Sequence, residues 1–367
     1  MNLRGESPSD LPVPRAVITG GASAYPPGRA QDDLWDNFFA SHYSGNRWAR
    51  RVWRAAGVDQ RHCAFDPTKE DLSSWSTRRR MDHYAGAAVP LAAEAASEAL
   101  QEAGVGAGDL GLVVVASCTG YVTPGVDILL AGALGVPPGA QRLLVGHMGC
   151  HAAIPGLSSA ADYVAGHGQP ALLVCVELPS LHVQPASSDL GQVTIHALFG
   201  DAAAAVVLEP EGRLAEGRLA GGLSGSGALA VADVVARTDA STAGHMTWEI
   251  TDSGFRMGLD RRVPDVIGSQ VTSLVDELLA RGGLKREEVA GWAVHPGGPR
   301  ILDVVGARLG LSDDQLGPSR EVLAARGNCS STTVLLILEE LRRRQCPGPV
   351  VLLAFGPGLT LYACLLR

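Results

Sequence analysis

The chain alternates between short apolar runs and longer stretches in which apolar residues recur at helical spacing. The short runs predict strands at 15–19, 171–176 and 350–355. The helical spacing predicts long helices over 80–103 and 263–281, and a Gly-Gly pair stops the second one. Strands that alternate with helices are typical of an α/β fold with one large core.

The pattern also repeats along the chain. One predicted strand ends just before Cys118 and another just before His295. The interval from Cys118 to Cys150 is nearly the same as the interval from His295 to Asn328. A helical stretch follows each second member, at 157–164 and at 333–343, and leads into one of the predicted strands. The chain therefore looks internally duplicated, with two βαβ-rich halves facing each other across a pseudo-twofold axis.

We divide the chain into three parts on this basis. Residues 1–14 are polar and contain proline, which predicts a loose tail. Residues 15–230 form the predicted N-terminal half and residues 231–367 the C-terminal half. The crossover between the halves is placed at 209–230, where Gly, Leu, Ala and Ser show no clear periodicity.

Composition excludes several classes of protein. A net charge of −8 without a long basic run argues against nucleic acid as the main partner. No apolar run reaches the roughly 20 residues that a membrane span needs. The seven cysteines show no CxxC pairing and no secretory leader precedes them, so we expect a reduced, cytoplasmic protein.

Basic residues cluster once along the chain. The members of this cluster are Arg47, Arg50, Arg51, Arg54 and Arg61. The cluster fits a site for the phosphates of a small molecule, and it fits equally a solvated helix face with Trp48 and Trp53 turned inward.

Cys150 is the candidate nucleophile. It follows Met148-Gly149 and precedes a predicted helix, so its thiol should feel the positive end of the helix dipole. That dipole and a nearby imidazole should lower the pKa of the thiol and favour the thiolate. Taken alone, a buried structural cysteine is the better interpretation.

His295 and Asn328 change that balance. His295 stands at the carboxyl end of an apolar strand, before Pro-Gly-Gly, where α/β proteins place reactive groups. Asn328 could be an ordinary helix N-cap. Together with Cys150 they predict an acyl-transfer site in which His295 and Asn328 donate hydrogen bonds to a thioester oxygen.

No metal or nucleotide site is expected. His147 and His151 flank Cys150, but no carboxylate or further cysteine accompanies them as a ligand. The glycine-rich fingerprints of dinucleotide-binding and P-loop proteins are also missing from the sequence.

At these residues the sequence resembles the type III polyketide synthases, the chalcone-synthase-like branch of the thiolase superfamily. The motifs that carry the resemblance are Ser117-Cys-Thr-Gly, Met148-Gly-Cys-His-Ala-Ala, Leu198-Phe-Gly-Asp-Ala-Ala-Ala-Ala, His295-Pro-Gly-Gly-Pro-Arg-Ile-Leu, Gly327-Asn-Cys-Ser-Ser and Phe355-Gly-Pro-Gly-Leu-Thr. The resemblance implies a homodimer with a thiolase-like αβαβα layered fold and no cofactor beyond coenzyme A thioester substrates. It also implies a Cys-His-Asn triad that loads an acyl-CoA starter on Cys150 and extends it with malonyl-CoA to an aromatic or pyrone product.

The resemblance assigns further roles by position. Phe199 and Met257 fall at the two gatekeeper positions between the coenzyme A tunnel and the cavity, and Arg51 and Arg54 fall in a basic region that binds coenzyme A. The positions that line the cavity in the family are here Cys118, Thr119, His182, Trp248 and Ser330.

Two of these residues depart from the family pattern. Trp248 replaces a small residue of the plant enzymes and should shorten or redirect the cavity. His182 could donate hydrogen bonds to a growing polyketide or transfer a proton, and the sequence does not choose between these roles. The segments at 180–185 and 254–264 are more similar to the bacterial members.

Three alternatives compete with this interpretation. A ketoacyl synthase III type enzyme would perform a single condensation, but its histidine is usually followed by Gln-Ala-Asn rather than the Pro-Gly-Gly after His295. A papain-like protease shares the residue order but normally brings disulfides and a secretory leader. A non-catalytic acyl-CoA-binding partner is weakened by the intact triad.

Overall fold

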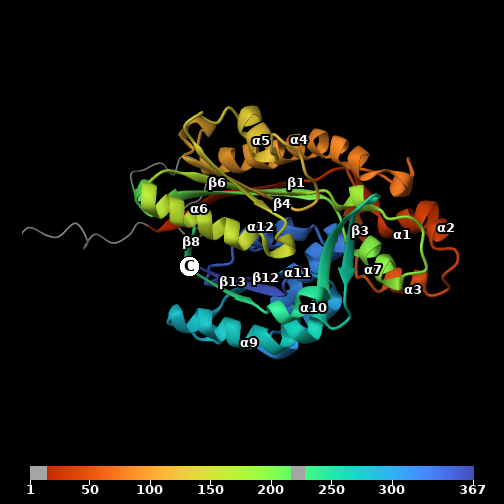
Figure 1. Cartoon of the computed structure of the whole chain (residues 1–367). Helices are drawn as coiled ribbons and strands as arrows, with labels where there is room; N and C mark the ends of the chain where they lie inside the picture. Colours follow the sequence, from red (N-terminus) through yellow and green to blue (C-terminus); the bar gives the residue numbers. More distant parts are fainter. Residues whose placement is uncertain (1–14, 216–227) are drawn as a thin grey trace, which may run out of the picture.

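The computed structural model describes residues 15–215 and 228–367. A mixed sheet of nine strands runs through the molecule (Figure 1). In spatial order its strands are β11 (Gly291–Val294), β12 (Val350–Gly356), β13 (Thr360–Leu366), β8 (Leu229–Thr238), β1 (Ala16–Ala24), β7 (Ala202–Pro210), β6 (Ala171–Glu177), β4 (Leu112–Ser117) and β5 (Gln141–Gly146). The two parts of the sheet meet where β1 pairs with β8, through Val17 with Ala230 and Ile18 with Leu229.

Helices divide this sheet into layers. Helices α4 (Thr77–Ala103) and α5 (Val126–Leu134) cover the outer face of the part that contains β1, β4, β6 and β7 (Figure 1). Helices α6 (Ala153–His167) and α12 (Thr333–Arg343) lie between the two parts. Helices α9 (Val263–Arg281) and α10 (Pro299–Leu309) cover the other outer face. The predicted αβαβα fold is confirmed.

Local sequence explains where the long elements begin and end. The side chain of Ser76 caps α4 by accepting a hydrogen bond from the Arg79 N–H, and Gly104 ends the helix with a left-handed φ of 65°. Strand β6 is buried along its whole length, as its apolar run predicts. The helices predicted at 263–281 and 333–343 are present with those bounds.

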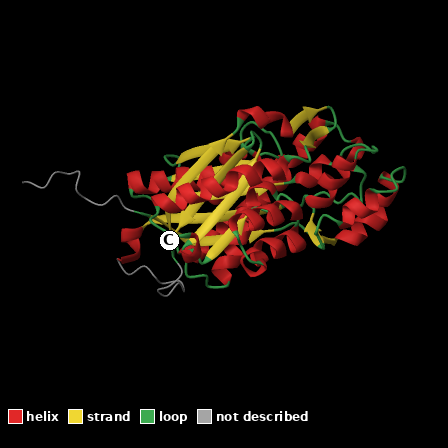
Figure 2. Cartoon of the chain, turned by 90° about the horizontal axis from the view of Figure 1, so that it is seen from below, coloured by secondary structure: helices red, strands yellow, loops and turns green. Residues whose placement is uncertain are grey.

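The structure also contains smaller elements. Two two-stranded sheets pair β2 (Gly28–Ala30) with β3 (Gln60–His62) and β9 (Met246–Thr251) with β10 (Gly254–Leu259). The remaining helices are α1 (Gln31–Leu34), η2 (Trp35–Phe39), α2 (Ala40–His42), α3 (Ala49–Arg54), η3 (Leu72–Ser74), η4 (Ala107–Asp109), η5 (Gly149–His151), η6 (Pro179–His182), α7 (Leu190–Leu198), α8 (Glu211–Ala215), η7 (Ala240–His245), η8 (Arg286–Glu288), α11 (Asp313–Arg326) and η9 (Ser330–Thr332). Figure 2 shows the strands enclosed by helices.

Two predictions fall partly or wholly on residues outside the described ranges. The predicted tail at 1–14 lies outside them, and so does the middle of the predicted crossover, at 216–227. The flanks of the crossover are regular, because β7 ends at Pro210, α8 follows it and β8 begins at Leu229.

Candidate active site

Cys150 lies in the single turn η5 between strand β5 and helix α6. The backbone reaches this turn through two left-handed residues, His147 with φ 60° and Gly149 with φ 75°. A Cβ atom on residue 149 would lie 2.7 Å from Cδ of Pro357, so only glycine fits there. The thiol of Cys150 is therefore carried on a strained elbow at the start of the middle helix layer.

His295 and Asn328 come from the C-terminal part of the chain, on the other side of α6. His295 directly follows β11, and its backbone N–H donates to the Leu353 carbonyl oxygen at 2.8 Å. Asn328 lies between α11 and η9, and its backbone forms a parallel bridge with Phe199. Both side chains are about 1% exposed. The side-chain Oδ1 of Asn328 accepts a hydrogen bond from the Ser330 N–H at 2.8 Å, which leaves the amide NH₂ to donate elsewhere.

A single cavity of about 1210 Å³ joins these residues. Its wall includes Cys150, His295 and Asn328, together with the predicted gatekeepers Phe199 and Met257. The structure thus brings together three side chains that are far apart in the sequence.

The protonation state of this site differs from the prediction. Burial raises the pKa of the Cys150 thiol to about 12, and hydrogen-bonding groups of Ser330 and Asn328 oppose the shift only in part. A helix terminus contributes about 0.3–1 kcal/mol at most sites, whereas one pKa unit corresponds to about 1.4 kcal/mol. Burial therefore opposes the predicted lowering of the Cys150 pKa, because the loss of hydration raises the pKa by more than the helix dipole lowers it.

His295 is neutral for the same reason. Burial lowers the pKa of its imidazole to about 3, and the neighbouring His151 lowers it further. Neither ring nitrogen of His295 has a hydrogen-bond partner among the described residues. A neutral imidazole with an unbonded nitrogen is able to accept the thiol proton. A thiolate–imidazolium pair forms only if that proton moves from Cys150 to His295.

Two inner cavities of about 40 Å³ each lie beyond Phe199 and Met257. One is next to Cys150, and four of the predicted cavity residues line it: Cys118, Thr119, Trp248 and Ser330. Trp248 lies on β9 and its indole N–H donates to the Cys118 carbonyl oxygen at 2.8 Å. The indole therefore has one fixed orientation inside a narrow space.

His182 lines the second inner cavity, which it shares with Trp248. Its Nδ1 accepts from the Phe255 backbone N–H at 3.0 Å, so Nε2 carries the proton and donates to the Thr119 carbonyl oxygen at 2.7 Å. Its ring also stacks on Phe255 with centroids 4.6 Å apart. Both polar roles that the sequence suggested for His182, donation to a polyketide and proton transfer, are therefore wrong in this structure, because backbone groups occupy both nitrogens.

Comparison with known proteins places this geometry in a family. Residues 66–211 match the N-terminal domain of chalcone and stilbene synthases, and residues 229–367 match the C-terminal domain. A 1,3,6,8-tetrahydroxynaphthalene synthase of Streptomyces peucetius subsp. caesius is 36% identical over 98% of this chain and 97% of its own length. The chain belongs to the chalcone and stilbene synthase family of type III polyketide synthases.

Further relatives agree with this assignment. An alpha-pyrone synthesis polyketide synthase-like protein of Mycobacterium tuberculosis, Pks18, is 32% identical over 84% of the chain and 79% of its own length. The crystal structure of PKS-I from the brown alga Ectocarpus siliculosus superposes with a TM-score of 0.88 at 29% identity and covers 98% of the chain and 99% of its own. The synthase is an acyltransferase, as the motifs predicted, and the ketoacyl synthase III alternative is not favoured. The predicted likeness to bacterial members is also confirmed.

Glu177 was not predicted from the sequence, and it holds two residues that line the first inner cavity, Cys118 and Thr119. Its fully buried carboxylate accepts hydrogen bonds from the Cys118 backbone N–H at 3.0 Å, from the Thr119 hydroxyl at 2.8 Å and from the Ser331 hydroxyl at 2.6 Å. Burial raises its pKa. A charged residue at the end of the apolar run 171–176 was the available signal.

The cavity of about 1210 Å³ that contains Cys150, His295 and Asn328 is the outer cavity. The basic residues near its mouth are only in part the ones that were predicted. Arg51 and Arg54 are exposed on α3, next to Val52, which lines the cavity, but neither arginine lines it. Arg261 and Arg300, from the loop before α9 and the start of α10, lie on its wall. The run Asp260-Arg261-Arg262 before a helix was the signal that could have indicated them.

Metal and membrane features can be reported for the described residues. Within 15–215 and 228–367 there is no group of three or more His, Cys, Asp or Glu side chains that could hold a metal ion. Among the helices of these ranges, none is both long enough and apolar enough to cross a bilayer.

Proposed function

We propose that the synthase loads an acyl-CoA starter on Cys150, extends it by decarboxylative condensation with malonyl-CoA, and cyclises the chain to an aromatic or pyrone product. In the loading step the thiol sulfur attacks the thioester carbonyl, His295 takes the thiol proton, and the coenzyme A thiolate leaves and is protonated. In the extension step malonyl-CoA loses carbon dioxide, and its enolate displaces Cys150 from the acyl group.

Asn328 and His295 hold the developing oxyanion in this proposal. One observation carries it: Cys150, His295 and Asn328 share one cavity wall while the Asn328 Oδ1 is occupied by the Ser330 N–H. With Oδ1 occupied, the amide NH₂ of Asn328 is the end that is left to donate, and we propose that it stabilises a thioester oxygen as negative charge develops.

The gate and the inner cavities support a short product. Phe199 and Met257 border the outer cavity and both inner ones, which fits the proposed role of gatekeepers. Each inner cavity has room for only a few atoms while Trp248 is in place. We therefore assign the starter and first extensions to small acyl groups.

Positively charged residues near the mouth of the outer cavity support a binding site for coenzyme A. Arg51 and Arg54 are exposed and make no ion pair among the described residues, and Arg261 is likewise unpaired there. Arg50, by contrast, is held by Asp32 and Asp36. We propose that Arg51, Arg54 and Arg261 bind the phosphates of coenzyme A, since unpaired guanidinium groups are free to form charge-assisted hydrogen bonds.

We also propose a homodimer. Strand β5 is a terminal strand of the sheet, and its Leu143 and Leu144 are 39% and 47% exposed. Ile128 and Leu129 of the neighbouring α5 are exposed as well. An unpaired edge with an apolar patch is stable when a second copy of the chain pairs with it.

Two further parts of the prediction are proposals of the same kind. The division into halves at 230/231 assigns Cys150 to one half and His295 with Asn328 to the other. A cytoplasmic location agrees with seven cysteines that are all thiols in the structure.

The test is to incubate the purified protein with malonyl-CoA and a panel of short, branched and aromatic acyl-CoA starters, and to identify products by mass spectrometry. Wild-type protein should release carbon dioxide and form extended products, and Cys150→Ala should form none. Full product formation by Cys150→Ala would disprove the proposed loading step, and absence of decarboxylation by the wild type would revive a non-catalytic role.

A further inference from the structure

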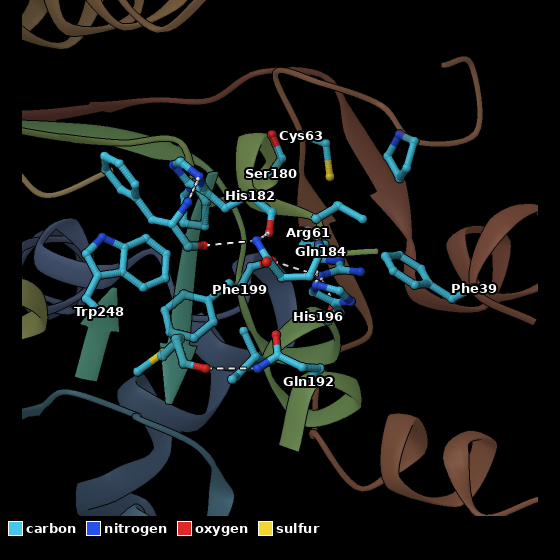
Figure 3. Close-up of a pocket in the computed structure, with 16 residues that line it drawn as sticks. Phe39, Arg61, Cys63, Ser180, His182, Gln184, Gln192, His196, Phe199 and Trp248 are labelled. Atoms are coloured by element: carbon cyan, nitrogen blue, oxygen red, sulfur yellow. Dashed lines mark hydrogen bonds between the residues drawn. The ribbon is translucent and has the colours of Figure 1, made fainter. Parts of the chain in front are cut away.

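The second inner cavity has a polar end that the proposed mechanism does not use. This cavity lies behind Phe199 and shares Phe199, Trp248 and Met257 with the cavity next to Cys150. Most of its wall is apolar, but Gln192 and Arg61 also border it (Figure 3). Each of these two side chains is about 4% exposed and carries one polar atom without a partner.

The hairpin of β9 and β10 carries Met257, and we call it the gate hairpin. It fixes the orientation of Gln192. Its Nε2 donates to the Met257 carbonyl oxygen at 2.9 Å, and because a carbonyl only accepts, the amide nitrogen must face the hairpin. Figure 3 shows the nitrogen turned toward the hairpin and the oxygen turned away from it. Oε1 of Gln192 is thus a buried acceptor with no donor among the described residues.

Arg61 supplies the complementary donor. Its Nη1 donates to the carbonyl oxygens of His196 and Phe199, the second at 2.8 Å, while Nε has no partner among the described residues. The guanidinium lies over the rings of Trp53 and Phe39, at 5.0 and 5.7 Å from their centroids. Within residues 15–215 and 228–367 it makes no ion pair, so a positive charge is buried behind the gate without a carboxylate in contact.

We propose that this cavity is a subsite for a hydroxyl group, either an alcohol or the enol of a β-ketone, at the far end of the starter or the growing chain. Such a hydroxyl accepts from the Arg61 Nε–H and donates to the Gln192 Oε1, which satisfies both atoms at once. A chain that ends in an alkyl group would leave both polar atoms without a partner. A chain that ends in a carboxylate would bring a second acceptor against the Gln192 oxygen. The inference rests on the proposed function, because it requires an acyl chain on Cys150.

The size of the cavity limits the group that enters. About 40 Å³ exceeds the roughly 10–15 Å³ that one water molecule requires, so a hydroxyl and the carbon that bears it fit while an aromatic ring does not. The proposal requires the side chains of Phe199 and Met257 to turn aside, because both border the two inner cavities.

The test is a competition for Cys150. Wild-type protein receives equal amounts of an n-acyl-CoA and the ω-hydroxyacyl-CoA of the same length, at several short and medium lengths, and intact mass gives the ratio of the two acyl-enzymes. We expect the hydroxyl form to be favoured by about tenfold to a hundredfold at one length, the range that one unpaired buried polar group produces. Gln192→Met, which removes the acceptor and leaves the Arg61 Nε–H in place, should lower that ratio severalfold.

Thr77→Val is the matched control. The Thr77 hydroxyl also holds the hairpin, through Thr251 and Gly254, but Thr77 lies outside the cavity. Thr77→Val should keep the preference. No preference in the wild type would mean that the polar atoms bind only water, and equal loss in both variants would assign the effect to hairpin position; either result overturns the subsite. Malonyl-CoA turnover, measured separately, shows whether the proposed function itself fails, and failure of both assays overturns both.

Discussion

At the scale of single residues, Trp248 limits the space next to Cys150. Its indole is fixed by the hydrogen bond to Cys118 and borders both inner cavities. Trp248→Gly should therefore admit a longer starter or further extensions, and product mass should increase by whole acetate units. Ile250→Gly is the control, because Ile250 lies on the same strand and is 71% exposed. Unchanged products from Trp248→Gly would contradict the steric argument.

In the proposed mechanism, His295 controls the reactivity of Cys150. Since burial raises the pKa of the thiol, the resting protein should alkylate slowly at Cys150 near neutral pH, and the rate should increase as the solution becomes alkaline. At neutral pH, where little thiolate is present, the thiol attacks as its proton passes to His295, which acts as a general base. His295→Gln should therefore slow iodoacetamide modification of Cys150 about tenfold or more at neutral pH and less at high pH.

Peptide mass spectrometry after timed alkylation measures this rate at Cys150 alone. Cys118, which is also buried with a raised pKa, serves as an internal reference in the same samples. Two results would contradict a neutral Cys150 and His295 in the resting protein. One is an alkylation rate at Cys150 that reaches a plateau below neutral pH, and the other is an equal rate in the wild type and in His295→Gln.

At the scale of elements, the elbow before α6 depends on glycine. Residue 149 has φ 75° and faces Pro357 at a distance that excludes a Cβ atom. Gly149→Ala should lower the free energy of unfolding by about 1–3 kcal/mol and displace Cys150 enough to abolish acylation. Gly146→Ala is the control, because that glycine has open space around its Cβ position and no left-handed φ.

Urea unfolding of both variants, together with acylation by an acyl-CoA, checks this prediction. If Gly149→Ala retains wild-type stability and acylation, the elbow is not strained in the way described.

The elements also show where sequence reasoning succeeds. The helices at 263–281 and 333–343 and the strands at 171–176 and 350–355 were predictable, because one apolar face or one apolar run defines each of them. The order of Cys150, His295 and Asn328 was visible as motifs. The bonds of His182, the role of Glu177 and the pKa of Cys150 were not, since each depends on which distant backbone groups lie nearby and on how much water is excluded.

At the scale of the whole molecule, buried histidines make stability depend on pH. Burial lowers the pKa of His182 and His295 to about 3 and of His151 to about 4, and it lowers that of His196 well below its usual value. In the unfolded chain these rings take up protons near pH 6.5. The free energy of unfolding should therefore be highest above about pH 6.5 and decrease below it, by up to about 1.4 kcal/mol per pH unit for each ring.

Urea unfolding at neutral and mildly acidic pH measures this decrease. The raised pKa values of Asp201 and Glu177 act in the opposite direction, but the four histidines outnumber them. His295→Gln should make the decrease shallower. Stability that does not change between neutral and mildly acidic pH would contradict the burial of neutral rings.

The dimer prediction also belongs to this scale. Leu144→Arg places a charge on the exposed edge strand β5 and should convert the protein to monomers, as measured by light scattering during size-exclusion chromatography. Ile250→Arg, at an exposed site on the hairpin, should leave the mass unchanged. A wild-type protein that is monomeric at micromolar concentration would contradict the assignment of this edge.

The backbone bridge between Phe199 and Asn328 lets the proposed gatekeeper position vary independently of the proposed catalytic position. The Asn328 N–H donates to the Leu198 carbonyl oxygen at 2.8 Å, and the Gly200 N–H donates to the Asn328 carbonyl oxygen at 3.0 Å. These bonds use only main-chain atoms, so they hold the proposed catalytic residue Asn328 in place whichever side chain stands at 199. A lineage that carries this bridge is able to explore new acyl groups through mutations at the gate without first losing turnover.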